Sequence, residues 1–193
     1  MALQAGEPVA DPSLFQRVLG PAWEQLHPAL QRFHSLRGRH VLQGEVCTEP
    51  ATHGLGRMLG WLMRLQRTAQ TGALRFVLEA QPLEERWTRF FPHTTMASTM
   101  ALRSEGIAER FGLATFHFSL VAEGDALVFR YDRLQVLGLP WPLAWAPAVA
   151  AREHGDGDRL HFDVEARLPW IGRVVRYAGW LAVPGRGGAA PTA

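Results

Sequence analysis

The sequence predicts an α+β fold built on a strongly curved antiparallel sheet or an open β-barrel of 8–9 strands, with an N-terminal helical arm and one inserted helix. Segments that alternate apolar and polar residues recur along most of the chain. Tight turns join most of these segments, so consecutive strands are expected to pair antiparallel. A sheet of this size curls into a barrel or folds around a helix.

The N-terminal arm is predicted from helix start and stop signals. Asp11-Pro12-Ser13 supplies a capping acid and a proline for a first helix, which Gly20-Pro21 breaks. Pro21 and Pro28 each open a further short helical piece. The inserted helix is predicted over Leu55 to Leu65, which is apolar on nearly every side and therefore buried, at a membrane surface or over a pocket.

Nine strands follow from period-two alternation. Their ranges are 39–48, 74–79, 84–91, 94–103, 113–121, 126–136, 148–154 and the two halves of the hairpin 160–181. Residues 107–111 are expected to form a helical turn instead. Residues 138–147 contain three prolines, so we expect an apolar connection there rather than a central strand.

Length and composition indicate one soluble domain. We expect a flexible tail over residues 1–10, a single domain over 11–183 and a disordered Gly/Ala/Pro tail over 184–193. The N-terminus lacks a basic start with an apolar run, and no apolar run is long enough for a spanning helix. Cys47 is the sole cysteine, which fits a reducing compartment. These features together predict a cytoplasmic protein.

The charge pattern excludes several kinds of chemistry. All 20 basic residues are arginines, and the formal net charge is only +2. Without lysine there is no Schiff-base nucleophile and no phosphate-loop lysine. Arginines and acids are interspersed rather than gathered on one block, so no nucleic-acid partner is expected.

Several blocks of sequence carry a resemblance to a known family. They are LFQRVLGPAW from residue 14, LRG from 36, ERWTRFF from 85, ERFG from 109, LGLPWPLAWAP from 137 and HFDVEARLPWIGRVVRYAGWL from 161. With these blocks the chain resembles, from about Leu14 to Leu181, a bacterial family known as domain of unknown function 4166. The resemblance implies one domain, no known activity and no agreed catalytic residues. Such domains also look to occur attached to short-chain dehydrogenase-like or membrane proteins, which implies an accessory role.

A polar strip is the best candidate for a site. In a strand, His161, Asp163 and Glu165 point to one face while Leu160 and Phe162 point to the other. If the polar face lines a cavity, it binds an anionic or hydroxylated ligand, and if not, it is solvated and salt-bridged. The candidate ligand-binding residues are Arg86, Arg89, His117, Arg130, His161, Asp163, Glu165, Arg176 and Tyr177.

Other kinds of site have less support. No metal site and no cofactor are expected, because the chain has no HExxH motif, cysteine pair or tight histidine cluster. Cys47 is expected to be a small core hydrophobe rather than a nucleophile. Trp61, Trp141 and Trp145 are candidates for covering a pocket, although core packing is the favoured use.

Three functions remain open at this level, and the sequence does not decide whether the protein is an enzyme. The leading hypothesis is a non-catalytic domain that binds a small amphipathic or lipid-like molecule in a barrel cavity. The second is an acid–base isomerase, lyase or hydrolase that uses His161 with Asp163 or Glu165. The third is an accessory protein–protein or membrane-surface module that uses Leu55 to Leu65, with membrane contact the less favoured version. The sequence indicates no oligomeric state.

Overall fold

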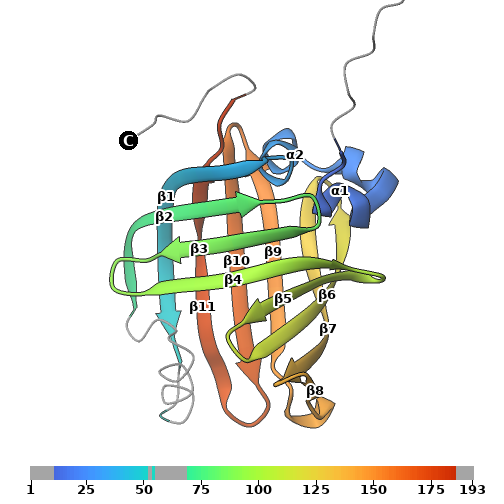
Figure 1. Ribbon diagram of the computed structural model, residues 1–193. Coiled ribbons are helices and arrows are strands. Elements are labelled where there is room, and N and C mark those ends of the chain that lie inside the picture. Colours follow the sequence, from blue (N-terminus) through green and yellow to red (C-terminus); the bar gives the residue numbers. More distant parts are fainter. Residues whose placement is uncertain (1–10, 52–53, 55–68, 186–193) are drawn as a thin grey trace, which may run out of the picture.

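The structure, a computed structural model, describes residues 11–51, 54 and 69–185. The strands are β1 (Gly38–Pro50), β2 (Gln70–Ala80), β3 (Glu84–Phe90), β4 (Thr95–Arg103), β5 (Gly106–Phe111), β6 (Ala114–Glu123), β7 (Ala126–Val136), β8 (Leu139–Pro140), β9 (Ala148–Asp156), β10 (Arg159–Leu168) and β11 (Gly172–Ala182). They form one antiparallel sheet in the order β6-β5-β4-β3-β2-β1-β11-β10-β9-β7-β8, and the additional pairing of β6 with β7 closes it (Figure 1). The fold is therefore a closed barrel of 10 strands. The expectation of an open barrel of 8–9 strands differs from the structure in closure and in strand number.

The extra strand is β5, where the sequence suggested a helical turn. Glu109 sits between Ile107 and Phe111 on the inward face of β5, and all three side chains are buried or half-buried. A charged residue at an inward position conceals the alternation that marks a strand. Strand β8 has only two residues and pairs with β7 outside the closed ring.

The N-terminal helical arm is confirmed. It comprises α1 (Leu14–Leu19), the 3-10 helix η1 (Gly20–Gln25) and α2 (Pro28–His34). Ser13, rather than Asp11, caps α1 in a capping box with Gln16, while α2 begins at Pro28 as expected. A further 3-10 helix, η2 (Leu143–Trp145), lies between β8 and β9. No helix in the described ranges has both the length and the apolar character needed to cross a membrane.

The barrel has two ends, because successive antiparallel hairpins turn at alternate ends. The arm covers one of them, which we call the helix end (Figure 1). There the amide of His27 donates to the carbonyl of Asp125 in the β6–β7 turn at 2.8 Å, and Arg32 pairs with Asp158 in the β9–β10 turn at 2.6 Å. The opposite end, called the far end, holds the β5–β6 turn, the segment 137–147 and the β10–β11 turn. The predicted helix over 55–65 and both predicted tails, apart from residues 184 and 185, lie outside the described residues.

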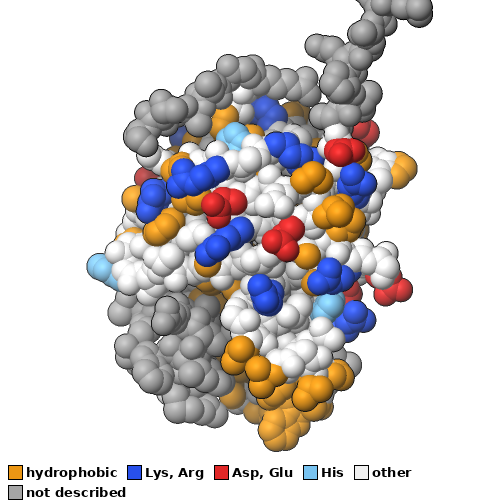
Figure 2. Space-filling model, viewed as in Figure 1, with side chains coloured by type: hydrophobic (Ala, Val, Ile, Leu, Met, Phe, Trp, Pro, Cys, Tyr) orange, Lys and Arg blue, Asp and Glu red, His pale blue; other side chains and the backbone are white. Residues whose placement is uncertain are grey.

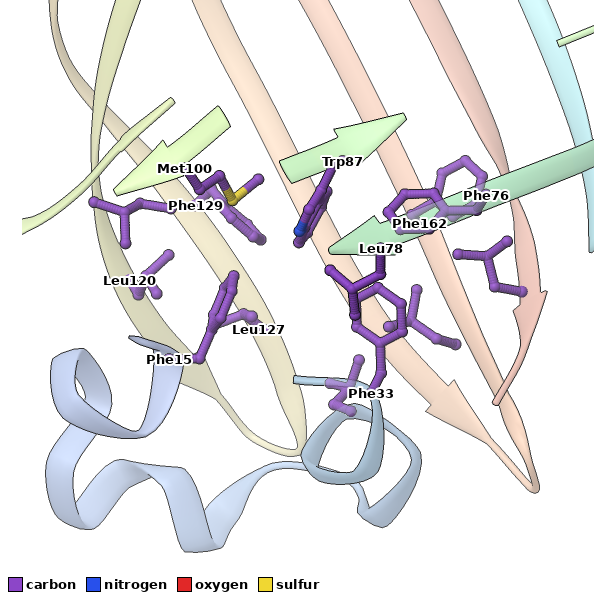
Figure 3. Packing of buried hydrophobic residues seen from close by; sticks show 14 of the residues in the cluster. Phe15, Phe33, Phe76, Leu78, Trp87, Met100, Leu120, Leu127, Phe129 and Phe162 are labelled. Carbon is purple, nitrogen blue, oxygen red and sulfur yellow. The ribbon is translucent and has the colours of Figure 1, made fainter. Parts of the chain in front are cut away.

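The core fills the barrel from the helix end inward. Phe15 of α1 and Phe33 of α2 are almost fully buried and project toward Trp87 and Leu127 from the strands (Figure 3). The rings of Phe15 and Trp87 stack at 6.2 Å, and Phe33 meets Trp87 edge-on at 5.8 Å. The short helices are thus held by aromatic packing rather than by helix propensity, which is small for segments of this length.

The seam between β1 and β11 depends on two glycines. Gly44 pairs with Leu181 and Gly179 with Val46. A Cβ at Gly44 would lie 1.8 Å from the carbonyl oxygen of Trp180, and one at Gly179 would lie 2.1 Å from that of Glu45. Only glycine allows the two backbones to approach this closely, so the seam requires glycine at both positions.

We predict that Gly44→Ala destabilises the barrel, because the new methyl group must push two hydrogen-bonded backbones apart. The expected loss is about 1–3 kcal/mol or more in the free energy of unfolding, measured by urea denaturation. Gly185→Ala is the matched control, since a Cβ there meets nothing within 4 Å. Equal stability of the two variants would contradict the close seam.

Candidate interior site

A small cavity of about 60 Å³ lies inside the barrel. Most of its wall is apolar, and it runs from Phe33 of α2 to Phe91 and Val164, both of which lie toward the far end. Four polar side chains share the wall: Arg89, Glu109, Glu153 and Tyr177. They come from β3, β5, β9 and β11, so the site is assembled from strands far apart in the sequence.

Three adjacent strands join through a buried hydrogen-bonded chain, which we call the Arg89 network. An Nη of Arg89 on β3 donates to the hydroxyl of Ser98 on β4 at 3.1 Å, and that hydroxyl donates to a carboxylate oxygen of Glu109 on β5 at 2.6 Å. The other Nη of Arg89 lies 3.5 Å from the same oxygen. The guanidinium of Arg89 also lies over an aromatic ring, with its carbon 5.0 Å from the ring centre of Trp87.

Burial controls the protonation of Glu109. Loss of hydration raises the pKa of this carboxyl above its ordinary value, and this effect outweighs the lowering effects of Arg89 and Ser98. Burial also raises the pKa of Glu85, against the lowering effect of His34 and of the hydrogen bond from Trp87. Desolvation in the interior therefore makes the charged form of both carboxyl groups costly unless a partner stabilises it.

Tyr177 brings a hydroxyl group to the cavity wall from β11. Its ring packs edge-on against Phe91 at 5.8 Å and lies 6.1 Å from Phe162. Burial raises the pKa of Tyr177 to about 12, so the phenol is neutral and can donate. Among the described residues the hydroxyl has no hydrogen-bond partner, which leaves it free for a molecule in the cavity.

A second polar pair lies nearer the helix end. His34 of α2 meets Glu153 of β9 with 2.7 Å between Nε2 and a carboxylate oxygen. Both side chains are buried, and His34 Nδ1 has no partner among the described residues. The pair ties α2 to the barrel wall. Glu153 also lines the cavity, and the hydrogen bond to His34 engages one of its two carboxylate oxygens.

The structure places the polar strip on the outer face of β10. Leu160, Phe162 and Val164 line the cavity, so the alternate residues His161, Asp163 and Glu165 point outward. The imidazole of His161 stacks on that of His154 at 4.9 Å, and burial and His154 lower its pKa.

The remaining ion pairs of the strip belong to the barrel exterior. Arg176 binds Asp163 at 2.7 Å and Glu49 at 2.9 Å, and Glu165 binds Arg167 at 2.7 Å. These contacts match the solvated, salt-bridged alternative for the strip. A role for its residues in binding stays a prediction.

The other candidates divide between the two faces. Arg89 and Tyr177 point inward, whereas Arg86 and Arg176 lie an odd number of residues away on the same strands and point outward. Arg130 is exposed and pairs with Glu123 at 3.1 Å, and His117 contacts Gln135 at 3.0 Å on the outer face. The structure thus brings two of the nine candidates to the cavity.

Two of the three candidate cover residues, Trp141 and Trp145, are absent from the cavity wall. Trp141 and Trp145 are exposed at the far end. Trp61 lies outside the described residues. Cys47 is exposed on β1, so the expectation that it packs in the core is wrong.

Sequence reasoning missed the acidic half of the site. Glu85, Ser98, Glu109 and Glu153 were not candidates, although each shares the inward parity of apolar neighbours on its strand. A charged residue at an apolar position of a period-two pattern was the available signal. Among the described residues no group of three or more metal-ligating side chains is close enough to hold an ion.

The comparisons with known proteins give a family. A family model described as a domain of unknown function (DUF4166) matches residues 26–181. No curated protein matches the chain. Among solved structures, the crystal structure of Rv2717c from M. tuberculosis matches with 13% sequence identity and a TM-score of 0.48, and covers 83% of this chain and 99% of that one. A likeness at this level carries no conclusion about function.

We predict that Glu109→Gln removes part of the pH dependence of stability. Because the folded-state pKa of Glu109 is raised, its contribution is fully present below the unfolded value of about 4.5 and is lost as pH rises through the folded value. The free energy of unfolding of the wild type minus that of Glu109→Gln should therefore fall as pH increases from about 4.5. Urea denaturation across a pH series measures this difference, and a difference that rises with pH would contradict the assignment.

Proposed function

We propose that this chain, which belongs to the DUF4166 family of domains of unknown function, binds a small amphipathic molecule inside the closed barrel. The observation that carries the proposal is the composition of the cavity wall, which is aromatic and aliphatic except for four convergent polar side chains. An apolar cavity with a few placed polar groups is typical of small-molecule sites. In addition, the hydroxyl of Tyr177 has no partner among the described residues.

The polar groups favour an uncharged hydrogen-bonding head on the ligand. Glu85, Glu109 and Glu153 are buried acids, and Arg89 is already paired with Glu109. An anionic ligand would add another negative charge to this low-dielectric space. A hydroxyl or amide group instead accepts from Tyr177 and donates to the carboxylate of Glu153, since both residues line the cavity.

The volume sets the size of the ligand. About 60 Å³ accommodates a few waters and is far below the roughly 300 Å³ of a drug-sized pocket. The ligand is therefore a short chain, or the cavity enlarges when flexible wall residues change rotamer. Met100 is the flexible apolar side chain on the wall that can move in this way.

Acid–base catalysis is the second candidate, and one observation supports it at a place other than His161. The carboxyl of Glu109 has a raised pKa and lines the same cavity as Tyr177. Perturbed acids in a cavity are candidates for proton transfer. An enzyme would lose turnover in Glu109→Gln while it retains binding, and a binding protein would show no turnover with any ligand.

We expect the Met100 methyl group to report binding. In ¹³C-methyl NMR, butan-1-ol and butanamide should shift its resonance saturably, with a Kd in roughly the millimolar range for ligands of this size. Butanoate, which is similar in size but anionic, should bind more weakly.

Native mass spectrometry of the purified protein should also retain any molecule that already occupies the cavity after purification.

Two matched tyrosine variants test the site. Tyr177→Phe removes the hydroxyl that faces the cavity and should weaken binding of butan-1-ol about fivefold, the effect of one hydrogen bond. Tyr131→Phe removes a buried hydroxyl that is not on the wall and should leave binding unchanged. Unsaturable shifts with all three probes, together with a bare native mass, would reject the proposed function.

A further inference from the structure

Large apolar side chains are exposed together at the far end of the barrel. They are Leu113, Leu137, Leu139, Trp141, Trp145 and Trp170, and we call them the apolar rim. Trp170 is 100% exposed and Trp145 is 71% exposed. Figure 2 shows hydrophobic side chains gathered at this end, over β8. Six of the eight exposed large hydrophobic residues in the described ranges belong to the rim, so this end differs from the rest of the surface.

The rim is built from separate connections that meet in space. The amide of Leu137, after β7, donates to the carbonyl of Leu113 in the β5–β6 turn at 2.9 Å. The indole of Trp141 donates to the carbonyl of Trp145 at 3.2 Å, which fixes the segment between β8 and β9. Trp170 lies at the tip of the neighbouring β10–β11 hairpin. The rim residues therefore project from one end of a rigid barrel.

Two rim residues occupy a backbone conformation that bulky side chains avoid. Leu137 has φ 55° and Trp170 has φ 67°, and they are the non-glycine residues with positive φ among those described. A left-handed conformation is unfavourable for large side chains and is retained where the surroundings or a function require it. Here it coincides with the most exposed tryptophan and with an exposed leucine.

Charge separates the two ends of the barrel. At the helix end, three of the four strand-connecting turns carry an acid: Glu105, Asp125 and Asp158. At the far end, the described connections 91–94, 112–113, 137–147 and 169–171 contain no acidic residue. Arg110 and Arg133 are exposed beside the rim, and neither forms an ion pair with a described residue. The far end is thus apolar and flanked by unpaired positive charge.

We propose that the apolar rim docks on the surface of a membrane that contains anionic phospholipids. Tryptophan prefers the headgroup level of a bilayer, and leucines at loop tips reach the acyl boundary. Arg110 and Arg133 meet the negative lipid headgroups. The rim residues protrude from several separate connections. Such an arrangement matches a flat, deformable bilayer surface better than the groove of a protein partner. The proposal uses the outer surface of the barrel and stands independently of ligand binding in the cavity.

Vesicle flotation tests the proposal. The full chain should float with phosphatidylcholine vesicles that contain phosphatidylglycerol, and less with phosphatidylcholine alone. Trp145→Gln combined with Trp170→Asn should lower the partition coefficient at least about tenfold, because two buried indoles are lost. Asparagine is chosen at position 170 because it tolerates positive φ. Leu83→Gln is the control, since Leu83 is also exposed, at 53%, but lies at the helix end.

The arginines have a separate readout. Arg110→Gln combined with Arg133→Gln should remove most of the preference for anionic vesicles, since each charge contributes roughly fivefold near such a surface. The proposal is overturned if the wild type fails to float, or if the tryptophan variant floats as well as Leu83→Gln. A third outcome also overturns it. If light scattering shows that the wild type is a dimer and the tryptophan variant a monomer, and neither protein binds vesicles, then a second copy of the chain covers the rim.

Discussion

A charged pair inside a closed barrel is the constraint on which the rest of the interior depends. Arg89 and Glu109 are both buried, and a buried charge is tolerated only with a partner and further hydrogen bonds. Ser98 supplies those bonds from the strand between them. A shift of one residue in any of β3, β4 or β5 would turn a member of the network to the outside. The network therefore fixes the register of three strands while it supplies polar groups to the cavity.

The two ends of the barrel have different roles in this account. At the helix end, Phe15 and Phe33 fill the interior, and the His34–Glu153 pair holds α2 against β9. The far end carries the apolar rim. The two proposals rest on separate observations, and together they are consistent with a small amphipathic molecule that reaches the barrel from a lipid surface.

Most of the fold could be predicted from the sequence because period-two alternation records which face of each strand is buried. The alternation in β10 correctly separated an apolar face with Leu160, Phe162 and Val164 from a polar one, and the structure shows that the apolar face is the inward one. The closure of the barrel could not be predicted, because it depends on the pairing of β6 with β7 and on the strand β5. The alternation of apolar and polar residues fails in β5 because Glu109 occupies an inward position. There it pairs with Arg89, which lies 20 residues away in the sequence.

The site was predicted less well than the fold, for a related reason. A strip of charged residues on a strand identifies a polar face, and in a closed barrel of this size that face is the outside. The interior site consists instead of single polar residues at apolar positions, and no local pattern shows which of these meet. Arg89 and Tyr177 were candidates, whereas their partners on β5 and β9 become visible only when the strands are assembled.

The proposed function requires that the polar groups on the cavity wall recognise a small molecule. A high-resolution crystal structure of the protein with butanamide tests it most directly. We expect density for the amide beside the hydroxyl of Tyr177 and the carboxylate of Glu153, with the Arg89 network intact. An interior closed by apolar side chains, with Arg89 turned to the outside of the barrel, would contradict it.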